Sequence, residues 1–461
     1  IAFIQYLYEY LYDVPDGHIS ITGNFDNYKN EKIGGSYGFN LLPVDDGSVL
    51  VSYIIEESPA YTLGLRTGDK IIRWDGKHID SVGNREYLNY VRNYSTIEGR
   101  RYSKYLMLTR DSIGSTVAIT YKSSNTNEEK TISLVAFDDE RSLFVTGYFN
   151  TAPPPNMDSC VRYKILKNNI GFLYLGAEKS QGETPAEIMQ DPDYIAVKDA
   201  VTYFNSNNVE KLIVDLRFNL GGNDLQAAVT MGLFYSSRSF YEYVTGSYDN
   251  NYEIEHTLYT EPLTPLFDGE IAVIVDPNCI STGEGYAMMF QRLENAKVIS
   301  HWGSNGAFGM VSYDPILMPC GIQIDYPQGR SLNESQVIQL DSDSNLVGGV
   351  IPDIKVPLGV DATKRQWEQG IDVQLEYAIS NLLGIDNNYS TMNCISYPNP
   401  CSGIFNIELS DILKDDSEII FFDMFGKLVL RKNIGKGVRN FQIDLSNVSS
   451  GSYQYKIASV D

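Results

Sequence analysis

The chain has 461 residues, of which 43% are hydrophobic and 21% are charged, and its formal net charge is −23. These values indicate a globular protein of about three domains, and no apolar run approaches the roughly 18 residues of a transmembrane helix. The negative charge argues against a nucleic-acid partner, because no basic stripe is present to neutralise phosphates. The four histidines share no ligand spacing and the five cysteines form no CxxC pair, so we expect no metal and no cofactor.

Residues 1–32 are expected to form an N-terminal segment with a helical pattern, a turn and a short strand. The turn leads into Asp16, Gly17 and His18. A histidine in a turn is seldom part of a core, and its ordinary pKa suits proton transfer near neutral pH. His18 is therefore a candidate general base.

Residues 33–140 are expected to form an independent unit of strands and short helices. The expected elements are strands at 49–55, 116–122 and 131–137, a short helix that ends at Gly64, and a helix near 84–94.

The run SPAYTLGLRTGDKIIRWDG within this unit closely resembles the sequence of a PDZ domain. Tyr37, Gly38 and Phe39 lie where that family binds a terminal carboxylate. The resemblance implies that a peptide adds to the sheet edge and that these residues bind its end. The alternative is a PDZ domain used only as an internal gate or spacer.

Residues 141–384 alternate between strand and helix patterns, which indicates a layered α/β core. The expected elements are strands at 169–175, 211–216, 270–276 and 354–357, an amphipathic helix at 192–207, and a closing helix that stops at Gly384.

A polar linker at 385–393 separates this core from residues 394–461, in which short alternating strands predict a small Ig-like β-sandwich. The YPNP opening, the DMFGKLVL strand and the closing LSNVSSGSYQYKI resemble the C-terminal sorting domain of type IX secretion in Bacteroidetes. The resemblance implies export through the periplasm to the cell surface or beyond, with the type IX machinery as a partner. An ordinary Ig-like module is the alternative.

Ser281 follows a buried strand and precedes a helix pattern, and this turn can expose a serine beside backbone N–H groups. The spacing from Ser281 to Glu284 resembles the Ser-x-x-Glu motif of the carboxyl-terminal processing peptidases, the tail-specific proteases. VDLRFNLGG at 214–222 is similar to the Asp-Leu-Arg-x-Asn-x-Gly-Gly signature of the same family. The resemblance extends over 141–384 and implies a ClpP/crotonase-like protease core with an inserted PDZ domain.

Ser281 is the expected nucleophile, and the expected oxyanion hole consists of the N–H groups of Gly221, Gly222 and Thr282. Glu284, one helical turn beyond Ser281, either joins the catalytic group or only braces the turn.

The base is the unusual part of the expected site. Many family members use a lysine after the serine, but this chain has no lysine from 298 to 354. A histidine-using branch that includes the tricorn-like proteases has its histidine near the position of His18, and His301 is the second candidate. That branch also supplies a glutamate before the GV-PD segment; none occurs there, and Glu334 is nearby but unaligned.

We therefore expect a secreted serine endopeptidase that cleaves polypeptides, with the PDZ module recruiting a free C-terminus or gating the site. A non-catalytic peptide-binding protein that retains the protease fold is the alternative, and an esterase on the same core is a third reading.

Overall fold

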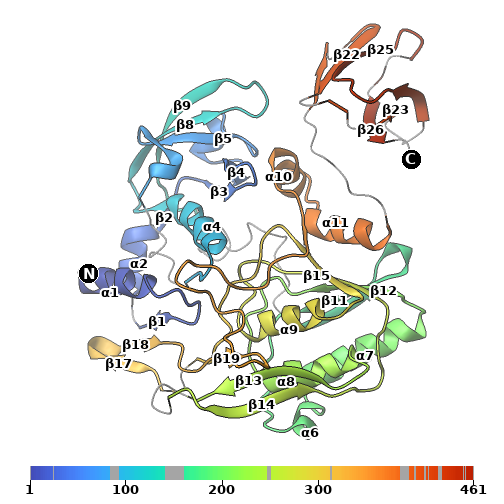
Figure 1. Cartoon of the computed structure of the whole chain (residues 1–461). Coiled ribbons are helices and arrows are strands. Elements are labelled where there is room, and N and C mark those ends of the chain that lie inside the picture. The colour runs from blue at the N-terminus through green and yellow to red at the C-terminus, as the bar shows by residue number, and fades with distance from the viewer. Residues whose placement is uncertain are drawn as a thin grey trace. The chain divides into compact units, whose positions relative to one another are not determined.

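The computed structural model describes residues 2–23, 25–83, 93–140, 160–246, 251–311, 314–384, 394–398, 401–409, 412–413, 415–423, 428–449, 451 and 453–459 (Figure 1). The chain divides into two compact units, Ile1–Ile385 and Asp386–Asp461. Nearly all of the helix expected near 84–94 and all of the linker expected at 385–393 lie outside the described residues. Within those ranges, no helix is long and apolar enough to span a membrane.

The N-terminal segment is anchored to a distant part of the chain. It contains α1 (Ala2–Tyr12), β1 (Ser20–Thr22) and α2 (Asp26–Ile33). β1 pairs antiparallel with β18 (Ile322–Asp325), which pairs with β17 (Ile316–Met318). Apolar side chains from both segments form one buried cluster: Tyr8, Leu11, Ile19, Ile21, Phe25, Tyr28, Ile322 and Ile324. This pairing fixes the turn that carries His18.

Residues 33–140 form a six-stranded antiparallel sheet in the order β3-β4-β5-β8-β9, with β6 on β5. Its strands are β3 (Phe39–Pro43), β4 (Val49–Ile54), β5 (Lys70–Trp74), β6 (Lys77–His78), β8 (Thr116–Lys122) and β9 (Glu129–Val135), beside a short β2–β7 pair (Gly35–Ser36, Arg110–Asp111). The expected strands are confirmed, and so is the short helix, α3 (Pro59–Thr62), which Ser58 caps by accepting the Tyr61 N–H. α4 (Ile97–Leu108) packs against β3.

The core sheet has the order β10-β11-β12-β15-β16-β20 and is parallel except for its first pair. Its strands are β10 (Val161–Ile165), β11 (Ile170–Leu175), β12 (Lys211–Asp215), β15 (Glu270–Ile274), β16 (Ala296–Ser300) and β20 (Ile354–Lys355). A smaller sheet joins β14 (Ile254–Thr260), β13 (Ser239–Thr245) and β19 (Ser331–Leu332).

Helices cover both faces of the core sheet (Figure 1). Leu212 and Val214 point into a cluster with α7 (Pro192–Ser206), α8 (Asp224–Thr230) and α9 (Thr282–Gln291). Ile213, between them, points into a second cluster that includes α11 (Val373–Leu382). Successive strand side chains face opposite sides, so a strand buried on both faces needs a continuous apolar run. This is the predicted layered α/β core.

The expected closing helix is two helices. α10 (Val360–Trp367) ends before Gly370, whose φ of +68° is left-handed, and α11 starts after Asp372, whose carboxylate accepts the Leu375 N–H. A left-handed residue interrupts an α-helix and favours glycine, so the chain breaks and restarts there.

The C-terminal unit contains two three-stranded antiparallel sheets, β21-β22-β25 and β24-β23-β26. Their bounds are β21 (Cys394–Tyr397), β22 (Ile404–Leu409), β23 (Ser417–Asp423), β24 (Leu428–Ile434), β25 (Asn440–Asp444) and β26 (Tyr453–Ser459). Phe405 and Ile443 from one sheet share a buried cluster with Ile419 and Phe421 from the other.

A buried guanidinium joins the end of β12 to α11. Arg217 contacts both carboxylate oxygens of Asp215, at 2.9 and 2.6 Å, and both of Asp372, at 2.9 and 2.7 Å. All three side chains are at most 17% exposed. Arg217 belongs to the DLRFNLGG signature, and its observed role there is structural.

Replacing Arg217 with Gln should lower the free energy of unfolding by about 3–5 kcal/mol, because two buried carboxylates lose their cation. Urea unfolding of the full chain measures this change. Arg238 pairs with Glu261 at 2.8 Å with both side chains about 60% exposed. Arg238→Gln is therefore the control and should cost less than about 1 kcal/mol; equal losses in the two variants would contradict the assignment.

Candidate active site

Ser281 lies at the strand-to-helix turn between β15 and α9. Its φ of +58° and ψ of −134° are strained for a residue with a Cβ. A Cβ built on Gly221 would lie 2.5 Å from Ser281 Cβ and 3.1 Å from its Oγ. Only glycine allows the 221–222 turn to approach this closely, so the two predicted motifs meet at one point.

Glu284 braces the turn. Its Oε1 accepts hydrogen bonds from Ser304 Oγ at 2.5 Å and the Gly306 N–H at 2.7 Å, and its Oε2 accepts the Ala307 N–H at 2.8 Å. The Ser281 N–H in turn donates to the Ala307 carbonyl at 2.8 Å. Burial raises the pKa of Glu284 to about 7, although its three donors oppose the shift. Because both oxygens are engaged in the 304–307 loop, the geometry supports bracing rather than direct catalysis.

Two of the three expected oxyanion donors are free to serve. The Gly221 N–H donates to Asn219 Oδ1 at 2.8 Å, so its expected role as an oxyanion donor is wrong. The N–H groups of Gly222 and Thr282 make no hydrogen bond to any described residue. The Thr282 hydroxyl donates to the Gly222 carbonyl at 3.0 Å and to Asp224 Oδ1 at 2.7 Å, so the start of α9 is held against the 221–222 turn.

The Gly17 turn, which carries His18, packs against the residue that precedes Ser281. A Cβ on Gly17 would lie 2.5 Å from Ile280 Cδ1 and 2.4 Å from Asn305 Oδ1, so the turn packs against the residue before Ser281 and against the bracing loop. His18 is 9% exposed, and its Nδ1 lies 3.0 Å from Asp16 Oδ1, which also accepts the His18 backbone N–H. Its buried Nε2 has no hydrogen-bond partner among the described residues, so the expected contact with the Ser281 hydroxyl is not formed in this structure.

Carboxylates set the pKa of His18. Burial acts to lower it, but Asp16, Asp341 and Glu284 together raise it above the ordinary value of 6.5. Asp341 lies in a loop, and its Oδ1 accepts hydrogen bonds from the backbone N–H groups of Phe308 and Gly309. Burial raises the pKa of Asp341 and of Asp224 to about 6, and the nearby His18 opposes both shifts. The imidazole is therefore surrounded by negative charge.

The sequence pattern predicted no role for Asp16, and it did not indicate Asp224 or Asp341 as residues of the site. Asp224 directly follows the Gly-Gly-Asn turn, and this position in the sequence could have identified it as a residue of the site. No such signal marks Asp341, because only the tertiary fold brings its loop to His18.

The surroundings of the two other candidates, His301 and Glu334, do not favour a catalytic role. His301 Nδ1 contacts the Val356 carbonyl at 2.9 Å, and burial lowers its pKa to about 4, so it stays neutral and structural. Glu334 lies in an exposed turn.

In the loop expected to bind a peptide carboxylate, backbone N–H groups already donate hydrogen bonds within the chain. The Tyr37 N–H donates to the Thr109 carbonyl at 3.1 Å, and the Gly38 N–H donates to Ser36 Oγ at 3.2 Å. Tyr37 and Phe39 are each 2% exposed. The expected carboxylate capture at 37–39 is thus contradicted, because two of its donors and both side chains are used internally.

Comparison with known proteins agrees with this geometry. Residues 187–356 match the model of Peptidase family S41, and residues 396–461 match that of the Secretion system C-terminal sorting domain. No curated protein matches the chain.

Two solved structures of mature CPAF share the fold at low sequence identity. Mature CPAF complexed with lactacystin is 12% identical with a TM-score of 0.57, over 83% of this chain and 89% of that chain. Mature CPAF alone gives 12% and 0.53, over 84% and 88%. The photosystem II D1 C-terminal processing protease gives 15% and 0.33, over 71% and 73%. The chain thus carries a peptidase family S41 domain, which contains Ser281, and a secretion system C-terminal sorting domain after it.

Proposed function

We propose that this protein is an exported serine endopeptidase with Ser281 as the nucleophile. One observation carries the proposal: a strained serine packs against the Gly221–Gly222 turn, the N–H groups of Gly222 and Thr282 make no hydrogen bond to any described residue, and the turn that carries the buried His18 packs against Ile280. A structural serine needs neither the strain nor the unengaged donors.

In the proposed mechanism, Ser281 Oγ attacks the carbonyl carbon of a peptide bond while His18 Nε2 takes the hydroxyl proton. The N–H groups of Gly222 and Thr282 stabilise the oxyanion. His18 then gives the proton to the leaving amine, and water hydrolyses the acyl-enzyme through the same groups. The unpartnered Nε2 is the nitrogen that this step requires.

Asp16 supplies the third member of the catalytic group as a positioning residue. Its contact with Nδ1 fixes the tautomer in which Nε2 can accept a proton. Asp341 stabilises the imidazolium by charge from the opposite segment of the chain.

Residues 33–140 are, in this proposal, a PDZ-like module that gates the core rather than recruiting substrate. Tyr94 Oη donates to Asn278 Oδ1 at 2.7 Å, and Ser95 Oγ donates to Asn305 Oδ1 at 2.9 Å. Trp302 of the core is buried in one cluster with residues of β3 and α4. These contacts join the module to both segments that flank Ser281.

The sorting domain indicates export to the cell surface or the extracellular space. We assign this export to the type IX machinery of Bacteroidetes, by way of the periplasm. The two C-terminal sheets around one core support an Ig-like sandwich as the address.

A non-catalytic peptide-binding protein is the second candidate. The specific observation in its favour is that His18 Nε2 makes no hydrogen bond to Ser281. Contacts between catalytic groups are often loose before substrate binds, so the endopeptidase is preferred.

Replacing Ser281 with Ala should lower peptide hydrolysis by at least about 10³-fold, because the nucleophile is lost. Cleavage of a denatured casein substrate measures the rate, and a fluorophosphonate probe should label the unmodified chain at Ser281 only. Ser335→Ala, at an exposed serine, is the control and should keep full activity. A Ser281→Ala chain that cleaves normally would exclude this nucleophile; an unmodified chain that neither cleaves nor reacts would favour the second candidate.

The activity should depend on pH through His18. A general base acts when neutral, so kcat/KM should rise with pH through the raised pKa of His18, with a midpoint above 6.5. Asp16→Asn removes a charge that favours the imidazolium, so the midpoint should move down by about one pH unit and kcat/KM should fall at least about tenfold. Asp268→Asn, at an exposed site, should leave the profile unchanged. An unshifted midpoint in Asp16→Asn would contradict the pairing.

A further inference from the structure

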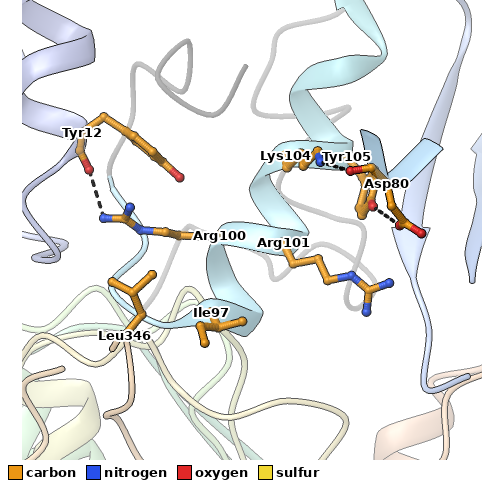
Figure 2. Close-up of a pocket in the computed structure, with 8 residues that line it drawn as sticks. All are labelled: Tyr12, Asp80, Ile97, Arg100, Arg101, Lys104, Tyr105 and Leu346. Atoms are coloured by element: carbon orange, nitrogen blue, oxygen red, sulfur yellow. Dashed lines mark hydrogen bonds between the residues drawn. The ribbon is translucent and has the colours of Figure 1, made fainter. Parts of the chain in front are cut away.

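A cavity of about 350 Å³ lies beside α4, on residues that the proposed chemistry does not use (Figure 2). It is lined by Tyr12, Asp80, Ile97, Arg100, Arg101, Lys104, Tyr105 and Leu346. The end of α1, one side of α4 and the loop at 346 form its walls. It is separate from the β3 face of α4, where Tyr102 and Leu106 pack with Trp302.

The lining is cationic in a strongly acidic chain. Among the lining residues that the structure describes, Arg100, Arg101 and Lys104 are cations, whereas Asp80 is the one carboxylate. The Arg101 guanidinium donates to the Gly47 carbonyl at 2.7 Å, and Lys104 Nζ donates to the Asp80 carbonyl at 3.3 Å. Neither forms an ion pair with any described residue. The hydrogen-bond partners of both groups are neutral carbonyls, and the Asp46 carboxylate acts on Arg101 only through space.

The spacing of the cations favours an extended ligand. Positions 100 and 104 are one helical turn apart, about 6 Å along the axis, so the charges do not converge on one point as a site for a single compact anion requires. Tyr12, Tyr105, Leu346 and the 56% exposed Ile97 add aromatic and apolar surface. This mixture suits carboxylates that alternate with apolar or aromatic side chains.

We propose that this cavity binds an acidic segment of a polypeptide and that the bound segment stabilises the His18 turn. Binding and the restraint of the turn are independent of the proposed function, and only the consequence for catalysis rests on that function.

Two segments that line the cavity also carry residues around His18. The Arg100 guanidinium stacks over the Tyr12 ring at 4.4 Å and donates to the Tyr12 carbonyl at 2.9 Å, and Tyr12 lies four residues before Asp16. On the other wall, the Ile97 N–H donates to the Leu346 carbonyl at 3.1 Å, in the loop that begins at Asp341. A ligand that contacts both walls therefore restrains the segments that carry two of the carboxylates around His18.

The test uses the full chain with Ser281→Ala, so that the probe is not cleaved. The probe is a fluorescein-labelled, amidated peptide of sequence Glu-Leu-Glu-Tyr-Glu, and its counterpart has Gln in place of each Glu. Fluorescence anisotropy at low salt should show saturable binding of the acidic peptide and none of the Gln peptide. Arg101→Gln with Lys104→Gln should weaken binding about tenfold, because two screened but unpaired charges are removed.

Lys198→Gln with Lys297→Gln is the matched control, since it removes two exposed cations elsewhere; its affinity should equal that of the parent chain. Equal affinity in the Arg101/Lys104 variant, or displacement of the peptide by millimolar inorganic phosphate, would overturn the acidic-peptide site.

Hydrogen exchange tests the link to His18 without needing activity. With the acidic peptide bound, backbone amides at 12–18 and 341–349 should exchange more slowly, and the Arg101/Lys104 variant should lose this protection at the same peptide concentration. Unchanged exchange in the parent chain at saturating peptide would overturn the link. Neither result depends on whether Ser281 cleaves peptides.

Discussion

The contact between Gly221 and Ser281 is the constraint on which the site depends. β12 and β15 are adjacent parallel strands, with Asp215 opposite Ile274, so their carboxyl ends open at the same edge of the sheet. The turns that follow must share a space in which a Cβ on Gly221 would lie 2.5 Å from Ser281 Cβ. Sheet register and one glycine together bring the serine to the 221–222 turn.

Buried carboxylates organise the surroundings of this contact. Glu284 holds the 304–307 loop, Asp224 holds the Thr282 hydroxyl, and Asp341 accepts the amides at 308–309. Burial raises the pKa of each of the three. Such groups are tolerated in an interior only when hydrogen bonds replace the lost water. Asp341 and Glu284 also act to raise the pKa of the buried His18.

The antiparallel unit at 33–140 is built into the core rather than tethered to it. Its contacts reach Asn278 and Asn305, on the two segments that flank Ser281, and Leu42, Tyr102 and Trp302 share one buried cluster. These contacts link the unit directly to the segments around Ser281. The α4 cavity has a similar link to the site, because Tyr12 in its lining lies shortly before the turn that carries His18.

The sequence by itself determined the elements that carry local patterns. Val197, Ala200, Val201 and Phe204 marked the buried face of α7, and the apolar run at 270–276 marked β15, because periodicity depends on neighbours along the chain. It also located Ser281, the Gly-Gly turn and His18. Only the tertiary structure showed that the Gly221 N–H donates to Asn219 and that the donors of the 37–39 loop are used internally. It also showed that Asp341 acts on His18 and that Glu284 holds the 304–307 loop. Thr109, Asp341 and the 304–307 loop are distant in sequence from the residues that they contact, so no local pattern predicts these contacts. The Gly221 contact with Asn219 spans only two residues, but the geometry of the folded turn decides it.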